Sequence, residues 1–335
     1  MNKEELNELE KICNIFDENY LVLCQVASYL NNAPDSLTKE IMEEITGGDK
    51  QFEEYSYAMF LANVFTEDEK LANDLLKKYY LKSVKRLNEQ EYYQNPYYKN
   101  IKIPNKTIDK WTLGYQKYKS YEAFIRDDLI IDGYREIPSI GYFDKTFSFP
   151  TVFENGVEWM AIKPNEIETM KQSIKEAKGN VLVYGLGLGY YAYMISLKNE
   201  VSNITIIERD ESVIKLFNEY ILSQFENKDK IRIIQCDAFE YAEKVAKNHT
   251  YTYVFVDLWH DVSDGTEMYM KMKKLEKHLS NATFSYWIEK SILSTIRPQI
   301  FDTLYTNIKE NKLQKSLEEI KHMLTDDFLK ELIKG

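Results

Sequence analysis

Four side chains that can accept or donate protons lie close together directly after the apolar run 253–256: Asp257, His260, Asp261 and Asp264. A histidine titrates near neutral pH and can act as a general base, whereas a carboxylate can orient or deprotonate an amine. We therefore name Asp257, His260 and Asp261 as candidate catalytic residues. The alternative for His260 is a loop histidine bonded to the backbone. All four could ligate a metal, but they follow no regular ligand motif, so we expect no metal.

A second chemical signal is the glycine-rich turn in residues 184–190, Tyr-Gly-Leu-Gly-Leu-Gly-Tyr. Glycines allow a sharp turn and a close approach by a ligand, and the helix that follows begins with free N–H groups. A dinucleotide fingerprint requires a small residue where Tyr190 stands, and the Gly-Lys-Ser/Thr of a P-loop is absent. We expect a different nucleotide-like ligand here, contacted by Tyr184, Gly185, Gly187 and Gly189.

Two further acids follow the next two apolar runs of the chain. Glu208 ends the run Ile206-Ile207-Glu208, and a carboxylate at this position can accept both ribose hydroxyls of an adenosine. Asp237 follows the run 231–236 and could accept from an adenine amino group, with apolar neighbours such as Ala238 against the ring. The alternatives are a solvent-exposed acid at Glu208 and a helix N-cap at Asp237.

Strands that alternate with helices from residue 180 onward would bring these residues together. We expect strands at 181–184, 204–208, 231–236, 253–257 and near 282–288, with helices at 190–198, 211–225, 238–247 and 265–279. This alternation predicts an α/β fold with a Rossmann-like, doubly wound and mainly parallel sheet, whose ligand lies beyond the carboxyl ends of the strands. No sixth or seventh strand is evident after residue 288, and residues 294–335 are expected to be helical.

The region before residue 180 has a different pattern. Residues 1 to about 90 show helical spacing of apolar residues, and 91–120 form a Tyr-rich, loop-like connector interrupted by Pro96 and Pro104. This connector is either packed between domains or a hinge or substrate lid. We expect three domains: a helical N-terminal domain with its connector (1–120), a β-hairpin region with a lead-in helix (121–179), and a ligand-binding α/β domain with a helical tail (180–335).

The β-hairpin region is predicted by short strands at 139–143, 146–152 and 157–162, with Asn155-Gly156 as a hairpin turn. A helix should begin at Pro164 and run to about residue 178. Tyr142, Trp159, Asn165 and Glu166 either overhang the substrate or serve only in hairpin packing and helix capping.

Composition narrows the class of protein. The 335 residues carry a net charge of −11 without a dense Lys/Arg run, which makes nucleic acid an improbable partner. Three separated cysteines fit a reduced compartment. The polar, acidic start and the lack of 18 consecutive apolar residues predict no signal peptide and no membrane span, so we expect a cytoplasmic protein.

The order of glycine turn, Glu208, Asp237 and Asp257 resembles the class I S-adenosylmethionine-dependent methyltransferases over residues 180–290. The resemblance implies S-adenosylmethionine as cofactor: the turn packs on its methionine part, Glu208 holds the ribose, and Asp237 reads the adenine. Asp257 would face the methionine end and the substrate.

The hairpin upstream and the acids after the fourth strand also resemble the spermidine-synthase-type aminopropyltransferases, which use decarboxylated S-adenosylmethionine. Several positions depart from both families. Val183 stands where most methyltransferases have an acid, Leu186 and Leu188 replace the acid in the aminopropyltransferase turn, and Asp257 and Asp261 are spaced by four residues instead of three.

Three functions follow from these resemblances. The first is a methyltransferase acting on a small or peptide-like nucleophile, and the second is an aminopropyltransferase-like enzyme. The third is a non-catalytic binding or scaffold protein on the same fold, which the absence of an acid at Val183 keeps open. The N-terminal helices could form a homodimer or recruit a partner.

Overall fold

The computed structural model describes residues 2–335, and the chain divides into two compact units. Unit 1 consists of Met1–Glu89, Lys117–Phe147 and Leu293–Leu329, and unit 2 consists of Gln90–Gln116, Ser148–Ile292 and Lys330–Gly335. Each unit is therefore assembled from separate stretches of the chain. The three-domain division expected from the sequence remains a prediction.

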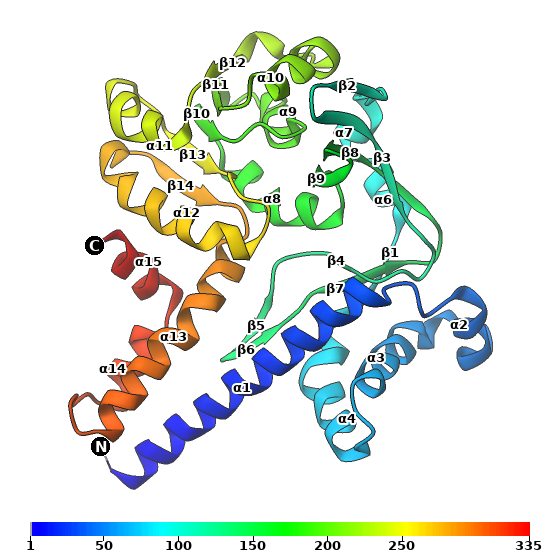
Figure 1. Ribbon diagram of the computed structural model, residues 1–335, viewed down its shortest axis with the longest axis vertical. Helices are drawn as coiled ribbons and strands as arrows, with labels where there is room; N and C mark the ends of the chain where they lie inside the picture. The colour runs from blue at the N-terminus through cyan, green and yellow to red at the C-terminus, as the bar shows by residue number, and fades with distance from the viewer. Residues whose placement is uncertain (1) are drawn as a thin grey trace. The chain divides into compact units, whose positions relative to one another are not determined.

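The N-terminal part of unit 1 is helical, as the apolar spacing predicted (Figure 1). Its helices are α1 (Lys3–Asn32), α2 (Lys39–Thr46), α3 (Glu53–Val64), α4 (Glu69–Leu75) and the short α5 (Leu81–Ser83). The first helix begins with a capping box, in which the Asn2 side chain accepts from the Glu5 N–H and Glu5 accepts from the Asn2 N–H. Residues from α1 to α4 share one buried cluster with Tyr121, Ile140 and Tyr142.

Unit 1 also contains strands. Parallel pairing joins β1 (Val84–Leu87) to β7 (Ile140–Phe143), and β4 (Phe124–Ile125) pairs with β7 in the antiparallel direction. A separate hairpin is formed by β5 (Ile130–Asp132) and β6 (Arg135–Ile137). The strand expected at 139–143 is thus present, but it pairs with β1 and β4.

The last helices of the chain are α13 (Glu289–Lys309), α14 (Leu317–Met323) and α15 (Asp326–Lys334). Within unit 1, the buried guanidinium of Arg297 forms ion pairs with the carboxylates of Glu136 and Asp326. Burial raises the pKa of Glu136, and the Arg297 charge opposes that rise. This network joins the C-terminal helices to β6.

Unit 2 is organised around a parallel sheet of five strands, coloured green to gold in Figure 1. In the order of the sheet they are β12 (Ile231–Gln235), β11 (Val201–Glu208), β10 (Gly179–Tyr184), β13 (Tyr253–Val256) and β14 (Thr283–Tyr286). All neighbouring pairs are parallel. The predicted α/β alternation and parallel sheet are therefore confirmed.

The register of this sheet aligns the residues expected to carry chemistry. Tyr184 pairs with Ile207 on one side and with Val256 on the other, and Glu208 pairs with Gln235. The segments that follow β10, β11, β12 and β13 consequently leave the sheet at the same edge. Residues far apart in the sequence converge there because parallel strands end together.

Helices follow the first four strands of the sheet in chain order, β10, β11, β12 and β13. They are α9 (Tyr190–Ser196), α10 (Glu211–Leu216), the single turn α11 (Ala238–Glu240) and α12 (Val262–Leu275). In front of β10 lies α8 (Pro164–Glu176), whose first residue is the expected proline. Among residues 2–335 no strand follows β14, and no helix is long and apolar enough to cross a membrane.

A second sheet of unit 2 has the order β2-β3-β8-β9. It contains β2 (Lys106–Ile108), β3 (Trp111–Tyr118), β8 (Phe147–Glu154) and β9 (Val157–Ala161). The hairpin of β8 and β9 turns at Asn155-Gly156, both with positive φ, as the Asn-Gly signal predicted.

The expectation of a loop-like connector at 91–120 was wrong. This stretch contains β2 and β3 and the helix α7 (Pro96–Asn100), whose Tyr97 donates its hydroxyl to the Leu188 carbonyl and packs on the rings of Tyr190 and Tyr193. Pro96 does not interrupt order here, because it occupies the first turn of α7, where a proline is tolerated.

Candidate functional site

The candidate site is a cavity of about 480 Å³ in unit 2, at the carboxyl edge of the parallel sheet. This volume is in the range of small-molecule binding sites. Side chains and backbone from the segments after β10, β11, β12 and β13 form one side, and residues of β3, β8, β9 and α8 form the other. The lining includes Lys110, Trp111, Glu154, Trp159, Met160, Glu166, Gly185, Gly187, Glu208, Arg209, Asp210, Cys236, Asp237, Ala238, Asp257, Trp259, His260, Met268 and Trp287.

The glycine turn after β10 is packed tightly against other parts of the chain. Gly185, Gly187 and Gly189 all have positive φ, which favours glycine. A Cβ on Gly185 would lie 1.9 Å from the Asp257 carbonyl oxygen, and a Cβ on Gly187 would lie 2.1 Å from Met160 Sδ. The turn needs glycine because of these protein contacts, independently of any ligand.

Protein acceptors also hold the N–H groups of this turn. Leu186 N–H donates to Glu208 Oε2 at 3.3 Å, and Leu188 N–H donates to Met160 Sδ at 3.2 Å. The N–H groups of Gly185 and Gly189 donate to the carbonyls of Ile207 and Leu186. Four N–H groups of the turn are therefore committed to protein acceptors.

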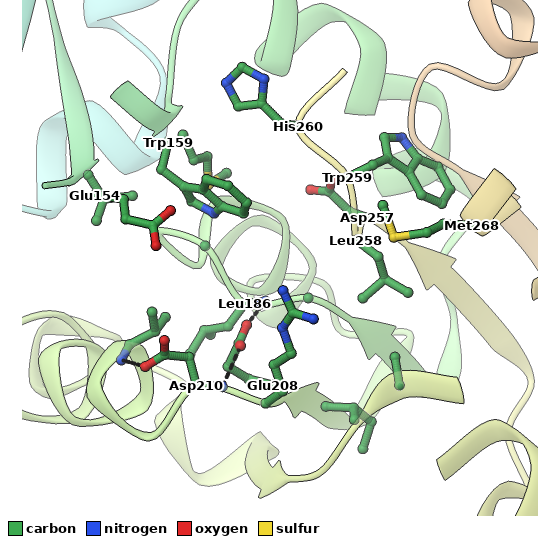
Figure 2. A pocket seen from close by; sticks show the side chains of 18 of the residues that line it. Glu154, Trp159, Leu186, Glu208, Asp210, Asp257, Leu258, Trp259, His260 and Met268 are labelled. Atoms are coloured by element: carbon green, nitrogen blue, oxygen red, sulfur yellow. Dashed lines mark hydrogen bonds between the residues drawn. The ribbon is translucent and has the colours of Figure 1, made fainter. Parts of the chain in front are cut away.

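Glu208 lies at the end of β11, directly beside the turn, and faces the cavity (Figure 2). Its carboxylate accepts the N–H of Leu186 and, at 2.9 Å, the N–H of Asp210. Burial raises the pKa of Glu208, and these backbone hydrogen bonds lower it. A carboxylate oxygen has two lone pairs, so Glu208 can still accept hydroxyl groups from a ligand.

Asp237 is a helix cap, one of the two roles considered from its sequence position, and its contact with adenine stays a prediction. It is the N-cap of α11, where its side chain accepts from the N–H groups of Phe239 and Glu240 at 2.9 and 3.0 Å. It also lines the cavity, next to Cys236 and Ala238. The capping hydrogen bonds fix the carboxylate at the far end of the pocket.

Two neighbouring carboxyl groups, the partly buried Asp257 and the buried Glu166, line the other end of the cavity. Asp257 follows β13, and Glu166 lies in the first turn of α8, where only 6% of its surface is exposed. Burial raises the pKa of Asp257 to about 7. Burial and the neighbouring Asp257 charge also raise the pKa of Glu166 well above its usual range. Two like charges in a poorly solvated site repel, so this pair retains a proton near neutral pH.

The rest of the loop after β13 divides into two groups. His260 lines the cavity with an exposed side chain, and its ring lies 5.9 Å from that of Trp159. Asp261 and Asp264 instead form the capping box of α12, and Asp264 accepts the N–H groups of His260 and Asp261. Asp261 is not among the residues that line the cavity. Its side chain caps α12 and so helps to hold this loop in place.

All four tryptophans of the chain line this cavity. The indole N–H of Trp111 donates to Asp210, and that of Trp287 donates to Thr169 of α8, both at 2.9 Å. The indole N–H of Trp259 is buried, and no acceptor for it exists among the described residues.

The structure brings together most residues singled out from the sequence. Those that line the cavity are Gly185, Gly187, Glu208, Asp237, Ala238, Asp257 and His260. Two others lie behind it: Tyr184 is 1% exposed with its ring near Tyr241, and Gly189 packs against Phe217. Residues 2–335 contain no group of three or more His, Cys, Asp or Glu side chains placed to hold a metal ion, and this includes Asp257, His260, Asp261 and Asp264.

The second wall of the cavity contains residues whose role in the site was not evident from the sequence. Glu166 and Trp159 were weighed there mainly as capping and packing residues, and Met160, Trp111 and Arg209 were not considered. The available signal was their position in the hairpin and lead-in helix directly before β10.

Part of the chain is similar to one known protein family. A model described as the spermine/spermidine synthase domain matches residues 161–320, which include the parallel sheet, Glu166 and Asp257. This is the second of the two families that the sequence resembles. No curated protein matches the chain.

Two solved structures are also similar. One is the spermidine synthase from Thermotoga maritima, with 15% identity and a TM-score of 0.31, and the other is a spermidine synthase in complex with the transition state analogue AdoDATO, with 17% identity and a TM-score of 0.30. Both alignments cover 41% of this chain and 48% of the solved chain. The chain thus spans about half the length of these structures.

Proposed function

We propose that unit 2 is an aminopropyltransferase-type enzyme, which binds decarboxylated S-adenosylmethionine and transfers its aminopropyl group to an amine. The observation that carries this proposal is the pair formed by Asp257 and the buried Glu166 in a cavity whose opposite end holds Glu208. The match to the spermine/spermidine synthase domain supports it independently. We also propose that the sheet is of the doubly wound, class I methyltransferase type, because β10 lies at its centre and the cavity lies at the carboxyl edge.

The adenosine part of the donor fits the end of the cavity formed by β11 and β12. Glu208 would accept the ribose hydroxyls, Asp237 would accept from the adenine amino group, and Ala238 would pack against the ring. The carboxylates at this end already have backbone donors that hold them in place. This donor set suits a neutral nucleoside with hydroxyl and amino groups.

The other end of the cavity suits positive charge. A sulfonium and a primary ammonium are both cationic, and Asp257 and Glu166 would stabilise them in a partly desolvated site. Aromatic faces from Trp159 and Trp111 add a surface that attracts cations. Intact S-adenosylmethionine has a carboxylate, which these acids would repel, and this favours aminopropyl over methyl transfer.

The proposed reaction is an in-line displacement. The lone pair of the acceptor nitrogen forms a bond to the carbon next to the sulfonium, the carbon–sulfur bond breaks, and its electron pair leaves on sulfur as a neutral thioether. The nitrogen loses one proton, which the ionised member of the Asp257–Glu166 pair can accept. The enzyme contributes positioning of the two reactants and removal of this proton.

Calorimetric titration with decarboxylated S-adenosylmethionine, S-adenosylmethionine and NAD tests the proposal. We expect the decarboxylated compound to bind most tightly and mass spectrometry to detect aminopropyl transfer to an alkyl diamine. Asp257→Asn should abolish transfer and weaken donor binding to a much smaller extent, because Glu166 remains beside the cationic end of the donor. Asp264→Asn, a loop acid that caps α12, is the matched control.

Other results of these titrations would support one of the other two functions. Tight binding of S-adenosylmethionine with methyl transfer would replace the proposal by the methyltransferase alternative, and binding of none of the three would favour a scaffold protein. A homodimer through the N-terminal helices and a cytoplasmic location stay predictions.

A further inference from the structure

The thioether of Met160 covers the glycine turn on the side that faces the cavity. Met160 lies in β9, in the sheet that forms the second wall, and its Sδ accepts the N–H of Leu188 at 3.2 Å. The same sulfur would lie 2.1 Å from a Cβ on Gly187, so the side chain rests directly on the turn. The space that a backbone glycine usually leaves for a ligand is filled here by this side chain.

Sulfur is a weak hydrogen-bond acceptor, whereas a carboxylate is a strong one. The Leu188 N–H is therefore bonded to a poor partner that a ligand carboxylate could outcompete if it had access. The neighbouring N–H of Leu186 already donates to the Glu208 carboxylate. As long as Met160 occupies its position, a carboxylate at the donor's sulfonium end cannot reach the Leu188 amide.

The charged side chains that line the cavity near Met160 also disfavour binding of a ligand carboxylate. Asp257 and Glu166 line the cavity and disfavour a second anion nearby. Of the lining cations, Lys110 is paired with Glu154, and Arg209 directly follows Glu208 in the chain, at the end of the cavity assigned to the ribose. A ligand carboxylate would thus meet two acids at this end of the cavity, with the Leu188 amide already bonded to Met160.

We propose that Met160 is a specificity-determining residue, which makes the site select a sulfonium donor without a carboxylate over one that has it. The inference rests on the proposed function and adds the residue responsible for the choice. Repulsion by the acids lowers affinity for the carboxylated donor, and Met160 removes the hydrogen bond that could offset this repulsion.

The test is calorimetric titration of the full chain with S-adenosylmethionine and its decarboxylated form, in the native protein, in Met160→Ala and in Met160→Leu. Met268→Ala is the matched control, because Met268 lines the same cavity from α12, on an element separate from β9 and the turn. In Met160→Ala the Leu188 N–H becomes accessible. We expect the preference for the decarboxylated donor to fall by about tenfold, the effect of one charge-assisted hydrogen bond. Met160→Leu keeps the volume and should retain most of the preference, and Met268→Ala should leave it unchanged.

The outcomes separate this inference from the proposed function. If the native protein binds neither donor, the proposed function fails. If the native protein prefers the decarboxylated donor and Met160→Ala retains that preference, only the role of Met160 is wrong. An equal loss of affinity for both donors in Met160→Ala, with an unchanged melting temperature, would likewise overturn the claim of selectivity.

Discussion

Replacing Asp257 by asparagine should stabilise unit 2 at high pH and leave its stability nearly unchanged at low pH. The folded state raises the pKa of Asp257 from its ordinary 3.8 to about 7 because the carboxyl group is buried. The folded protein therefore binds more protons than the unfolded chain between these two values, and stability decreases as the pH rises through this window. Asparagine is neutral throughout and escapes this loss.

The magnitude follows from the same shift. A change of one in pKa corresponds to about 1.4 kcal/mol. The rise to about 7 therefore limits the destabilisation of the folded protein by ionised Asp257 to about 4 kcal/mol. Part of the Asp257 surface faces the cavity and its solvent, which reduces the penalty. Because part of this loss already occurs below pH 5, we expect Asp257→Asn to gain about 1–3 kcal/mol at pH 8 relative to pH 5. Glu166→Gln should also raise the stability of unit 2 at pH 8 relative to pH 5, because removal of either acid relieves the repulsion between them.

Urea denaturation followed by tryptophan fluorescence measures this effect. All four tryptophans line the cavity, so their emission reports the unfolding of unit 2. The difference between variant and native protein is taken at each pH, which cancels contributions from other titrating groups. Asp264→Asn controls for loss of a carboxylate from the same loop. A difference for Asp257→Asn that is constant from pH 5 to 8, or a loss of stability at pH 8, would refute the argument.

Three further predictions concern other contacts. Glu208→Ala should weaken binding of the donor more than tenfold in calorimetry, since a charge-assisted hydrogen bond contributes about 1.5–3 kcal/mol; an unchanged affinity would show that Glu208 does not hold the ribose. Gly187→Ala should destabilise unit 2 by about 1–3 kcal/mol in urea denaturation, because of its positive φ and the contact with Met160, and Met160→Ala in the same chain should restore part of the loss. Arg297→Ala should cost about 3–5 kcal/mol, seen as earlier loss of helical circular dichroism in urea, because Glu136 would be left buried without its partner; a cost below about 1 kcal/mol would mean that the ion pair is dispensable.

The parallel sheet could be predicted because its signals are local. Each strand is a short apolar run, such as 253–256, followed by a polar residue and a helix. The Asn155-Gly156 turn and the proline that begins α8 are equally local, and both lie where expected. The strands β2 and β3 were missed because β3 is held by β8 from a distant part of the sequence. Pairing of that kind leaves little trace in a single segment.

The sequence by itself determined one wall of the site, because Gly185, Glu208, Asp237 and Asp257 follow successive parallel strands, whose ends must meet at one edge. The tertiary structure alone decided the opposite wall. Folding of β9 and α8 over that edge brings Glu166 to Asp257 and Met160 onto the glycine turn. The raised pKa values depend on this burial, and so does the loss of a free amide at Leu188. Neither burial nor a contact between distant segments is encoded in the spacing of residues along the chain.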